Sequence, residues 1–327
     1  MKNTGFIKRA VSLALCVMAS LMIVTADKDS AVLNFIIEDT LPAVAYENAE
    51  DSIEEPVDTE EPDIYEYILF DDTVTDEYAR KNYYIVSDRT GFLDGDIDID
   101  VFNSTDLGIN KKSDGPQVLI FHTHSSEMFS DSDPEKGLSE GIWGVGEELK
   151  NILETEYGLK VYHDTGRFDV VDGKTSTLGS YERMEPEIRK ILEKYPTIEL
   201  VIDMHRDGLP EGSDKLIAEI NGEQCAKVML FNGLTRLYED GELVDLKELE
   251  NPYLKENLAL SYRVYKNAEE RFPGLMRKMY IEAYRYSLHM KPKSMLIEVG
   301  AQNNTKAEAK NSMKYLAAAI ADTVLYE

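Results

Sequence analysis

Two histidines and a glutamate stand close together directly after an apolar run. The run, Val118 to Phe121, is predicted to form a buried strand, and His122, His124 and Glu127 follow it. Imidazole and carboxylate suit zinc at neutral pH, because both offer lone pairs without a large cost of deprotonation. The spacing from His124 to Glu127 lets one turn of the chain direct both side chains at one ion. We therefore predict that they are two zinc ligands.

Two later apolar runs also carry a polar group near their ends. His205 follows the run that begins at Leu200, and Glu298 lies within Leu296-Ile-Glu-Val-Gly300. We predict His205 as the third ligand, because three protein ligands leave a position open for water. Glu298 is the predicted general base for the proton of that water. Alternatively, His205 is a histidine of the core and Glu298 is a carboxylate paired within the sheet. For Glu127, the alternative is an exposed turn residue.

Arg206 and Asp203 flank the third predicted ligand. Arg206 is a candidate catalytic residue that would hold a substrate carboxylate or a developing oxyanion. A structural ion pair is the alternative. Asp203 is a candidate for orienting a ligating imidazole from behind. The alternative is an ordinary carboxylate that is solvated or paired.

His122 is an alternative candidate for the zinc site. It lies two residues before His124, so an extended backbone would place both side chains on one face. His122 is therefore either a group behind the site or the true ligand in place of Glu127. His163 and His289 are predicted to pack or to lie at the rim.

Helix and strand alternate through the middle of the chain. Helical spacing over 142–153 is followed by a strand at 159–163, a helix at 185–195 with Pro186 in its first turn, and a strand at 199–204. Such alternation implies parallel strands joined by right-handed crossovers. Further helices are predicted at about 255–272 and 306–325, with a strand around Ile297 between them. The predicted fold is thus an α/β class, with an open, mostly parallel sheet flanked by helices.

Asn221-Gly222 is a strong hairpin signal between two apolar runs. We expect it to make one edge of the sheet antiparallel. In an open parallel sheet, ligands bind at the carboxyl ends of the strands. Three separate strands would then bring His124, His205 and Glu298 to one edge.

The charge balance excludes one class of partner. The 327 residues carry a formal net charge of −27, which argues against nucleic acid. Cys16 and Cys225 are the two cysteines, so neither a disulfide framework nor a cysteine-based zinc site is expected.

The chain divides into four predicted regions. Lys2, Lys8 and Arg9 precede an apolar run, so residues 1–26 read as a signal peptide or a membrane anchor, with the remainder outside the membrane. Residues 27–62 are acidic and read as a disordered linker. Alternating residues predict a small β-rich region over 63–115, and residues 116–327 form the predicted catalytic domain.

Three segments resemble the signature blocks of the stage II sporulation protein P family. They are His122-Thr-His-Ser-Ser-Glu127, Asp203-Met-His-Arg-Asp207 and Ile297-Glu-Val-Gly-Ala-Gln-Asn-Asn-Thr305. The resemblance implies a zinc-dependent cell-wall hydrolase of an endospore-forming bacterium. That family is similar to the N-acetylmuramoyl-L-alanine amidases, which share an open α/β sheet and a His/Glu/His zinc site.

By the same resemblance, the substrate is septal peptidoglycan, cut between muramic acid and the stem peptide and also within peptide cross-links. The implied partners are stage II sporulation proteins D and M, and the implied setting is engulfment during sporulation. Two other classes remain open at this point. One is a zinc endopeptidase that cuts only cross-links, and the other is a non-catalytic wall-binding scaffold.

Overall fold

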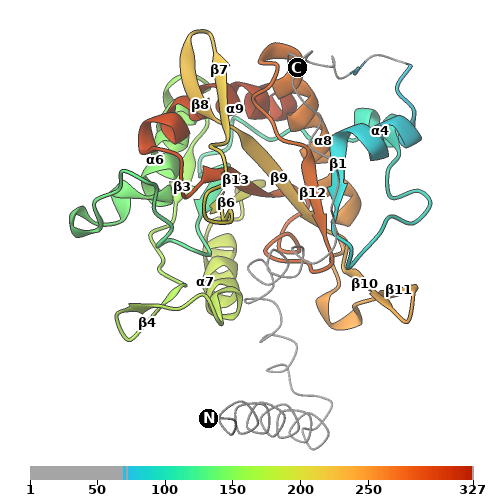
Figure 1. The fold of residues 1–327 in the computed structure, drawn as a ribbon, viewed down its shortest axis with the longest axis horizontal. Coiled ribbons are helices and arrows are strands. Elements are labelled where there is room, and N and C mark those ends of the chain that lie inside the picture. Colours follow the sequence, from blue (N-terminus) through green and yellow to red (C-terminus); the bar gives the residue numbers. More distant parts are fainter. Residues whose placement is uncertain (1–68, 71–72, 326–327) are drawn as a thin grey trace, which may run out of the picture.

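The computed structural model describes residues 69–70 and 73–325 (Figure 1). The predicted leader at 1–26 and the acidic linker at 27–62 lie outside these residues. Within the described part, no helix has the length and apolar character needed to cross a membrane.

Six α-helices and three short 3-10 helices occur in the described residues. The α-helices are α4 (Asp76–Tyr83), α5 (Ile99–Ser104), α6 (Ile142–Thr155), α7 (Ser180–Lys194), α8 (Leu254–Arg271) and α9 (Lys306–Val324). The 3-10 helices are η2 (Pro134–Lys136), η3 (Leu138–Glu140) and η4 (Lys247–Leu249).

Seven strands form the main sheet, and three small hairpins stand outside it. The sheet strands are β1 (Tyr84–Val86), β2 (Val118–Phe121), β3 (Val161–His163), β6 (Leu200–Asp207), β9 (Val228–Gly233), β12 (Met279–Glu282) and β13 (Ser294–Ala301). The hairpins are β4 (Val170–Val171) with β5 (Lys174–Thr175), β7 (Ile217–Ile220) with β8 (Glu223–Ala226), and β10 (Arg236–Glu239) with β11 (Glu242–Asp245).

The sheet has the strand order β1-β12-β9-β13-β6-β2-β3. All neighbouring strands in it are parallel except β9 and β13, which are antiparallel. The predicted open, mostly parallel sheet is therefore confirmed. The predicted antiparallel edge is wrong, because the change of direction lies inside the sheet. No helix connects β6 to β9 or β12 to β13, and without a helical crossover β9 runs in the direction opposite to β6, and β13 in the direction opposite to β12.

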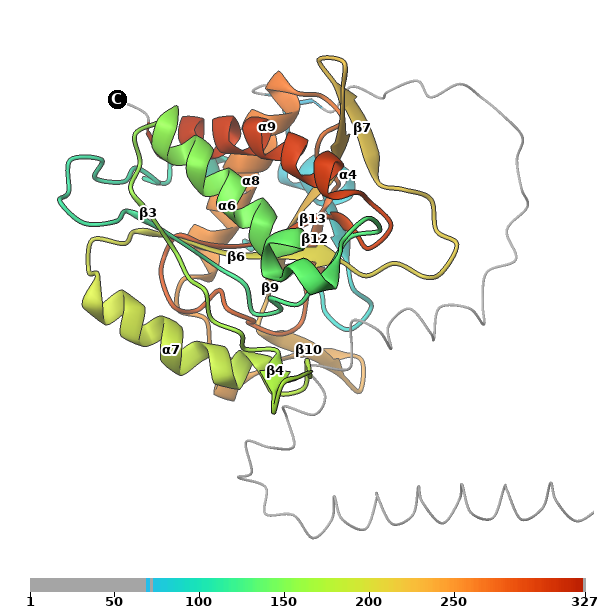
Figure 2. The same ribbon diagram turned by 90° about the vertical axis from the view of Figure 1, so that its left-hand side faces the viewer.

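Helices cover both faces of the sheet. Figure 2 shows α6, α8 and α9 on one side and α7 on the other. Side chains alternate accordingly along β2, where Val118 and Ile120 join the core under α6, α8 and α9, while Leu119 and Phe121 join the smaller core under α7. The same alternation in β6 directs Asp203 and His205 to the α7 face, because Val201 belongs to the α7 core.

The described part of region 63–115 differs from the predicted small β-rich region. It forms α4, the three-residue strand β1 and α5. The alternation of Ile97, Ile99 and Val101 does not make a strand, because the Asp98 side chain accepts from the Val101 N–H and begins α5. Buried residues of this region belong to the main core, and the rings of Tyr83 and Phe102 contact Tyr262 of α8.

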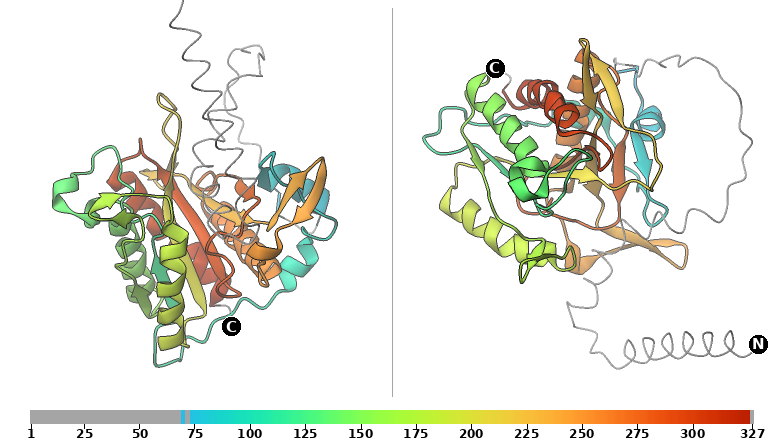
Figure 3. Two further views of the ribbon diagram at one scale, coloured as in Figure 1. Left: turned by 90° about the horizontal axis from the view of Figure 1, so that it is seen from below. Right: turned by 60° about the vertical axis from the view of Figure 1, so that its left-hand side comes forward.

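The hairpin predicted at Asn221-Gly222 is confirmed as β7–β8. Both turn residues have positive φ, 52° for Asn221 and 82° for Gly222, as this kind of tight turn requires. The hairpin forms its own two-stranded sheet and projects beside α9 (Figure 3). Helix α7 begins at Ser180, five residues earlier than predicted, so that Pro186 lies inside it rather than in its first turn.

Candidate metal centre

Three predicted ligands converge on the α7 face of the sheet. His124, Glu127 and His205 each place a ligand atom within 4.8 Å of the other two. The Nδ1 atoms of His124 and His205 lie 3.6 and 3.7 Å from Glu127 Oε1. These separations exceed an ordinary hydrogen bond and resemble the spacing of roughly 3.3–3.5 Å between ligands at 2.0–2.2 Å from a tetrahedral zinc.

The Glu127 carboxylate is held by the neighbouring strand. Its Oε2 accepts from the backbone N–H of Arg206 at 2.8 Å, which leaves Oε1 facing the two imidazoles. Burial by itself would raise the pKa of Glu127, but hydrogen bonding and charge from His124 and His205 lower it well below its usual range. Glu127 is therefore ready to act as an ionised ligand.

Asp203 orients the His205 ring and holds Thr123, the residue before His124. Its Oδ1 lies 2.8 Å from His205 Nε2, so the Nδ1 atom of that ring faces Glu127. The same carboxylate accepts from the Thr123 N–H at 2.9 Å and from its hydroxyl at 2.7 Å. Although burial lowers the pKa of His205, the Asp203 carboxylate outweighs it and raises that pKa. The sequence suggested that Asp203 orients a ligating imidazole from behind, and this geometry matches that role.

A second buried aspartate, Asp169, holds the other side of the ligand loop. Its carboxylate accepts from the Ser125 hydroxyl and from the Ser126 N–H, both at 2.8 Å. Thus the residue before His124 is fixed by Asp203, and the two after it by Asp169. Sequence reasoning missed Asp169, because nothing local distinguishes a loop aspartate 44 residues away from its partner.

His122 lies apart from the cluster. The chain leaves the extended conformation after Phe121, so the assumption that placed His122 and His124 on one face is wrong. The His122 ring faces α6 instead, with Nδ1 2.7 Å from the Met204 carbonyl oxygen and Nε2 2.9 Å from His163 Nε2. Burial lowers the pKa of His122 to about 3. His163 in turn contacts Glu147 of α6 at 2.8 Å.

Glu298 lies beside the cluster rather than within it. It is the register partner of His205 across β13 and β6, and its Oε2 is buried without a hydrogen-bond partner among the described residues. Burial and the charges of Asp207 and Glu127 raise the pKa of Glu298 to about 8, despite the opposing effect of His205. A carboxyl group with a pKa near neutrality is able to take up and release a proton under working conditions.

The Arg206 guanidinium is bound to the backbone. Its Nε donates to the Met128 carbonyl at 3.0 Å and one terminal nitrogen donates to the Asp207 carbonyl at 3.2 Å. The side chain therefore ties β6 to the loop that carries Glu127. Its predicted contact with a substrate oxyanion stays a prediction.

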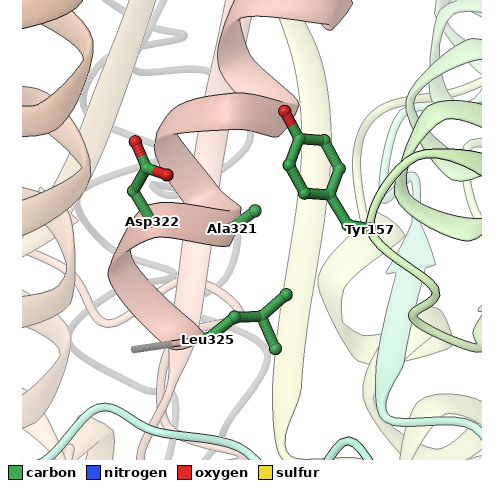
Figure 4. A pocket seen from close by; sticks show the side chains of 4 residues that line it. All are labelled: Tyr157, Ala321, Asp322 and Leu325. Atoms are coloured by element: carbon green, nitrogen blue, oxygen red, sulfur yellow. The ribbon is translucent and has the colours of Figure 1, made fainter. Parts of the chain in front are cut away.

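The donor set fits a zinc ion. Two imidazole nitrogens and one carboxylate oxygen are the ligands of catalytic zinc sites. In addition, among the described residues His124 Nε2 is buried without a hydrogen-bond partner, as is Oε2 of Glu298, which lies across from His205. A surface hollow lined by Tyr157, Ala321, Asp322 and Leu325 lies elsewhere, where α6 has ended and α9 makes its last turn (Figure 4). We associate no chemistry with it.

The fold and the cluster together define an open α/β-sheet protein with a candidate metal centre on one face of the sheet. Residues 18–321 match the family model of Stage II sporulation protein P (SpoIIP), so the chain belongs to that family. This confirms the resemblance seen in the signature blocks. No curated protein matches the sequence significantly.

Several solved structures are similar at low identity. The N-acetylmuramoyl-L-alanine amidase AmiC2 of Nostoc punctiforme is 15% identical with a TM-score of 0.37, over 67% of this chain and 97% of that one. The CwlD amidase of Clostridioides difficile, solved with the GerS lipoprotein, is 13% identical with a TM-score of 0.37, over 62% and 94%. An N-acetylmuramoyl-L-alanine amidase from Clostridium difficile 630 is 13% identical with a TM-score of 0.35, over 65% and 96%.

Proposed function

We propose that this protein is a zinc-dependent cell-wall hydrolase that cuts the amide bond between N-acetylmuramic acid and the stem peptide of peptidoglycan. Membership of the sporulation family supports a role in remodelling the septal wall during engulfment. The observation that carries the chemistry is the convergence of His124, Glu127 and His205 beside the buried carboxyl group of Glu298.

His124, Glu127 and His205 would hold the zinc. When bound, the ion would polarise the scissile carbonyl and make water a stronger nucleophile. Glu298 accepts a proton from the attacking water and passes it to the leaving amide nitrogen. Asp203 and Asp169 keep the ligand loop in place while this happens, because their carboxylates fix the backbone on both sides of His124.

The test is digestion of purified peptidoglycan by the full chain with zinc, followed by mass analysis of the products. The full chain is needed because β1 pairs with β12 and the rings of α4 and α5 lie in the main core. We expect free stem peptides and peptide-free glycan. Cross-link fragments that still carry muramic acid would instead identify an endopeptidase, and no soluble product would contradict hydrolysis altogether.

We further propose that the N-terminal segment tethers the domain outside the membrane, where it meets peptidoglycan and stage II sporulation proteins D and M. The basic residues before the apolar run at 10–26 support this orientation. Protease added to cells without a wall should remove the catalytic domain. Protection of that domain, while an external control protein is cleaved, would contradict the proposed placement.

A further inference from the structure

An aromatic surface begins at one of the candidate ligands. The ring of Tyr181, at the start of α7, meets the His124 ring edge to face with centroids 5.8 Å apart. Tyr286, from the loop between β12 and β13, meets Tyr181 in the same manner at 5.6 Å. Both tyrosines are partly exposed. Two rings from distant parts of the sequence thus contact each other, and one of them contacts a candidate ligand.

The backbone of Tyr286 is strained. Its φ is 49°, in the left-handed region that a bulky residue seldom adopts. Asp172, Asn221 and Asp240 share this conformation as short polar residues at the tips of hairpins, and Thr235 shares it in the connection between β9 and β10. Strain of this kind persists where the surrounding structure enforces it, often at a functional site. Because glycine or asparagine would fit this backbone better, the presence of tyrosine points to a use for the ring.

Glu185 links the two segments that carry the tyrosines. It lies on α7, one turn after Tyr181, and its Oε1 is 3.1 Å from His289 Nε2. Its Oε2 is 3.3 Å from a terminal nitrogen of Arg285, the residue before Tyr286. One carboxylate therefore joins the helix that carries the first ring to the loop that carries the second.

Four arginines near this surface are already bound, and the first of them, Arg89 beside Tyr286, is paired with Glu282. Arg183 donates to three backbone carbonyls, and Arg285 is paired with Glu185. Arg277, whose charge reaches Glu298, is paired with Asp207 at 2.6 Å. A ligand with several carboxylates, such as a stem peptide, would find little compensation here. An uncharged ring with an apolar face fits better, because the C–H groups of a sugar pack against aromatic rings.

We propose that Tyr181 and Tyr286 form a platform for a sugar ring of the glycan strand, and so determine which side of the scissile amide faces α7. This inference rests on the proposed function, because it assigns the glycan side of the same substrate. The tyrosines position the substrate and take no part in the proton transfer given to Glu298.

The test uses an uncharged tetrasaccharide of N-acetylglucosamine, titrated calorimetrically into the full chain. This probe has no scissile amide, so binding is measured even if the protein hydrolyses nothing. Tyr181→Ala and Tyr286→Asn should each weaken binding about three- to tenfold, the loss expected for one aromatic contact. Asparagine tolerates the left-handed backbone, so Tyr286→Asn should stay folded.

Two variants serve as controls. Tyr286→Phe keeps the ring and should bind like the wild type. Tyr157→Ala removes another partly exposed tyrosine, in the connection that follows α6, and should also bind like the wild type. If the wall is hydrolysed, Tyr181→Ala and Tyr286→Asn should raise KM and leave kcat nearly unchanged.

Unchanged tetrasaccharide affinity in both folded variants, or no binding by the wild type, would overturn the platform. Loss of affinity for free stem peptide with intact glycan binding would overturn the sugar assignment. Failure of wild-type hydrolysis together with tyrosine-dependent glycan binding would refute the proposed enzyme activity and keep the platform.

Discussion

Glu298 lies directly across from His205, residue for residue, on two adjacent parallel strands. The pairing places a buried carboxyl group next to a candidate ligand without making it a member of the His124, Glu127 and His205 cluster. Metal binding and proton transfer are thereby given to different side chains. Each can be tested by a separate substitution.

The first prediction concerns metal content. The full chain should bind about one zinc, because three N and O ligands with an open position suit this ion. His124→Ala and His205→Ala should lose most of it when measured by elemental analysis after dialysis, whereas Tyr157→Ala should not. Full retention of zinc by both histidine variants would show that the ligands have been assigned to the wrong residues.

Glu298→Gln should separate chemistry from binding. Glutamine keeps the size of the side chain but cannot accept the proton, and a positioned general base contributes about 10²–10⁴-fold to the rate. Stem-peptide release should fall by at least the lower figure, with zinc content unchanged. Near-normal release would make Glu298 a structural residue, and loss of zinc would make it a ligand.

Asp169→Asn should weaken the site although Asp169 touches no candidate ligand. The amide group can replace only one of the two acceptors that hold Ser125 and Ser126, so the loop carrying His124 should loosen. Loss of an outer partner typically costs about 10–100-fold in metal affinity, measurable by competition with a chelating dye. Asp98→Asn, at the start of α5, is the matched control and should bind zinc normally.

The stability of the metal-free protein should depend on the protonation of Glu298. Its pKa is raised from an ordinary 4.5 to about 8, so the folded state favours the protonated form. The associated stability is complete below pH 4.5 and is lost as the pH rises through 8. Glu298→Gln avoids this loss. The melting temperature of Glu298→Gln should therefore rise relative to that of the wild type as the pH increases from 5 to 8. A difference in melting temperature that does not change with pH would contradict the prediction.

Glu185 should show the opposite dependence. Its pKa is lowered to about 2, first by the contact with His289, so its ionised form stabilises the fold above pH 4.5. That contribution disappears as the pH falls through 2. Glu185→Gln should accordingly melt below the wild type at pH 7, and the gap should close toward pH 2. Solvent screening of this half-buried group limits the size of the effect.

Much of the candidate site was predictable because its residues lie within apolar strands or directly after them. The periodicity around Val118, Leu200 and Leu296 identifies three strands, and parallel strands bring their ends to one edge. The His122 alternative could not be resolved from sequence, since it depends on where the chain leaves the extended conformation after Phe121. Asp169 and Tyr286 depend on loops brought close by tertiary structure, for which local patterns give no signal.

The lack of a local signal for tertiary contacts also explains why the region before residue 116 does not form the predicted strands. Its alternating residues suggested separate strands, yet Asp98 begins a helix and Tyr83 and Phe102 pack on α8. In this region, helix capping and packing against a core formed by residues far along the chain override the local strand-like periodicity. Tertiary contacts decide the outcome in such cases.

The pairing of β1 with β12 has a consequence for biosynthesis. Tyr84 has Met279 as its register partner, so one of the earliest described segments to be made must wait for one of the latest. Contacts this distant in sequence slow folding, because a long loop must close before they form. A chain that ends before residue 279 would leave β1 without the strand that it pairs with. Until β12 is available, the unpaired edge of β1 and the apolar residues around it make the unfolded chain prone to aggregation.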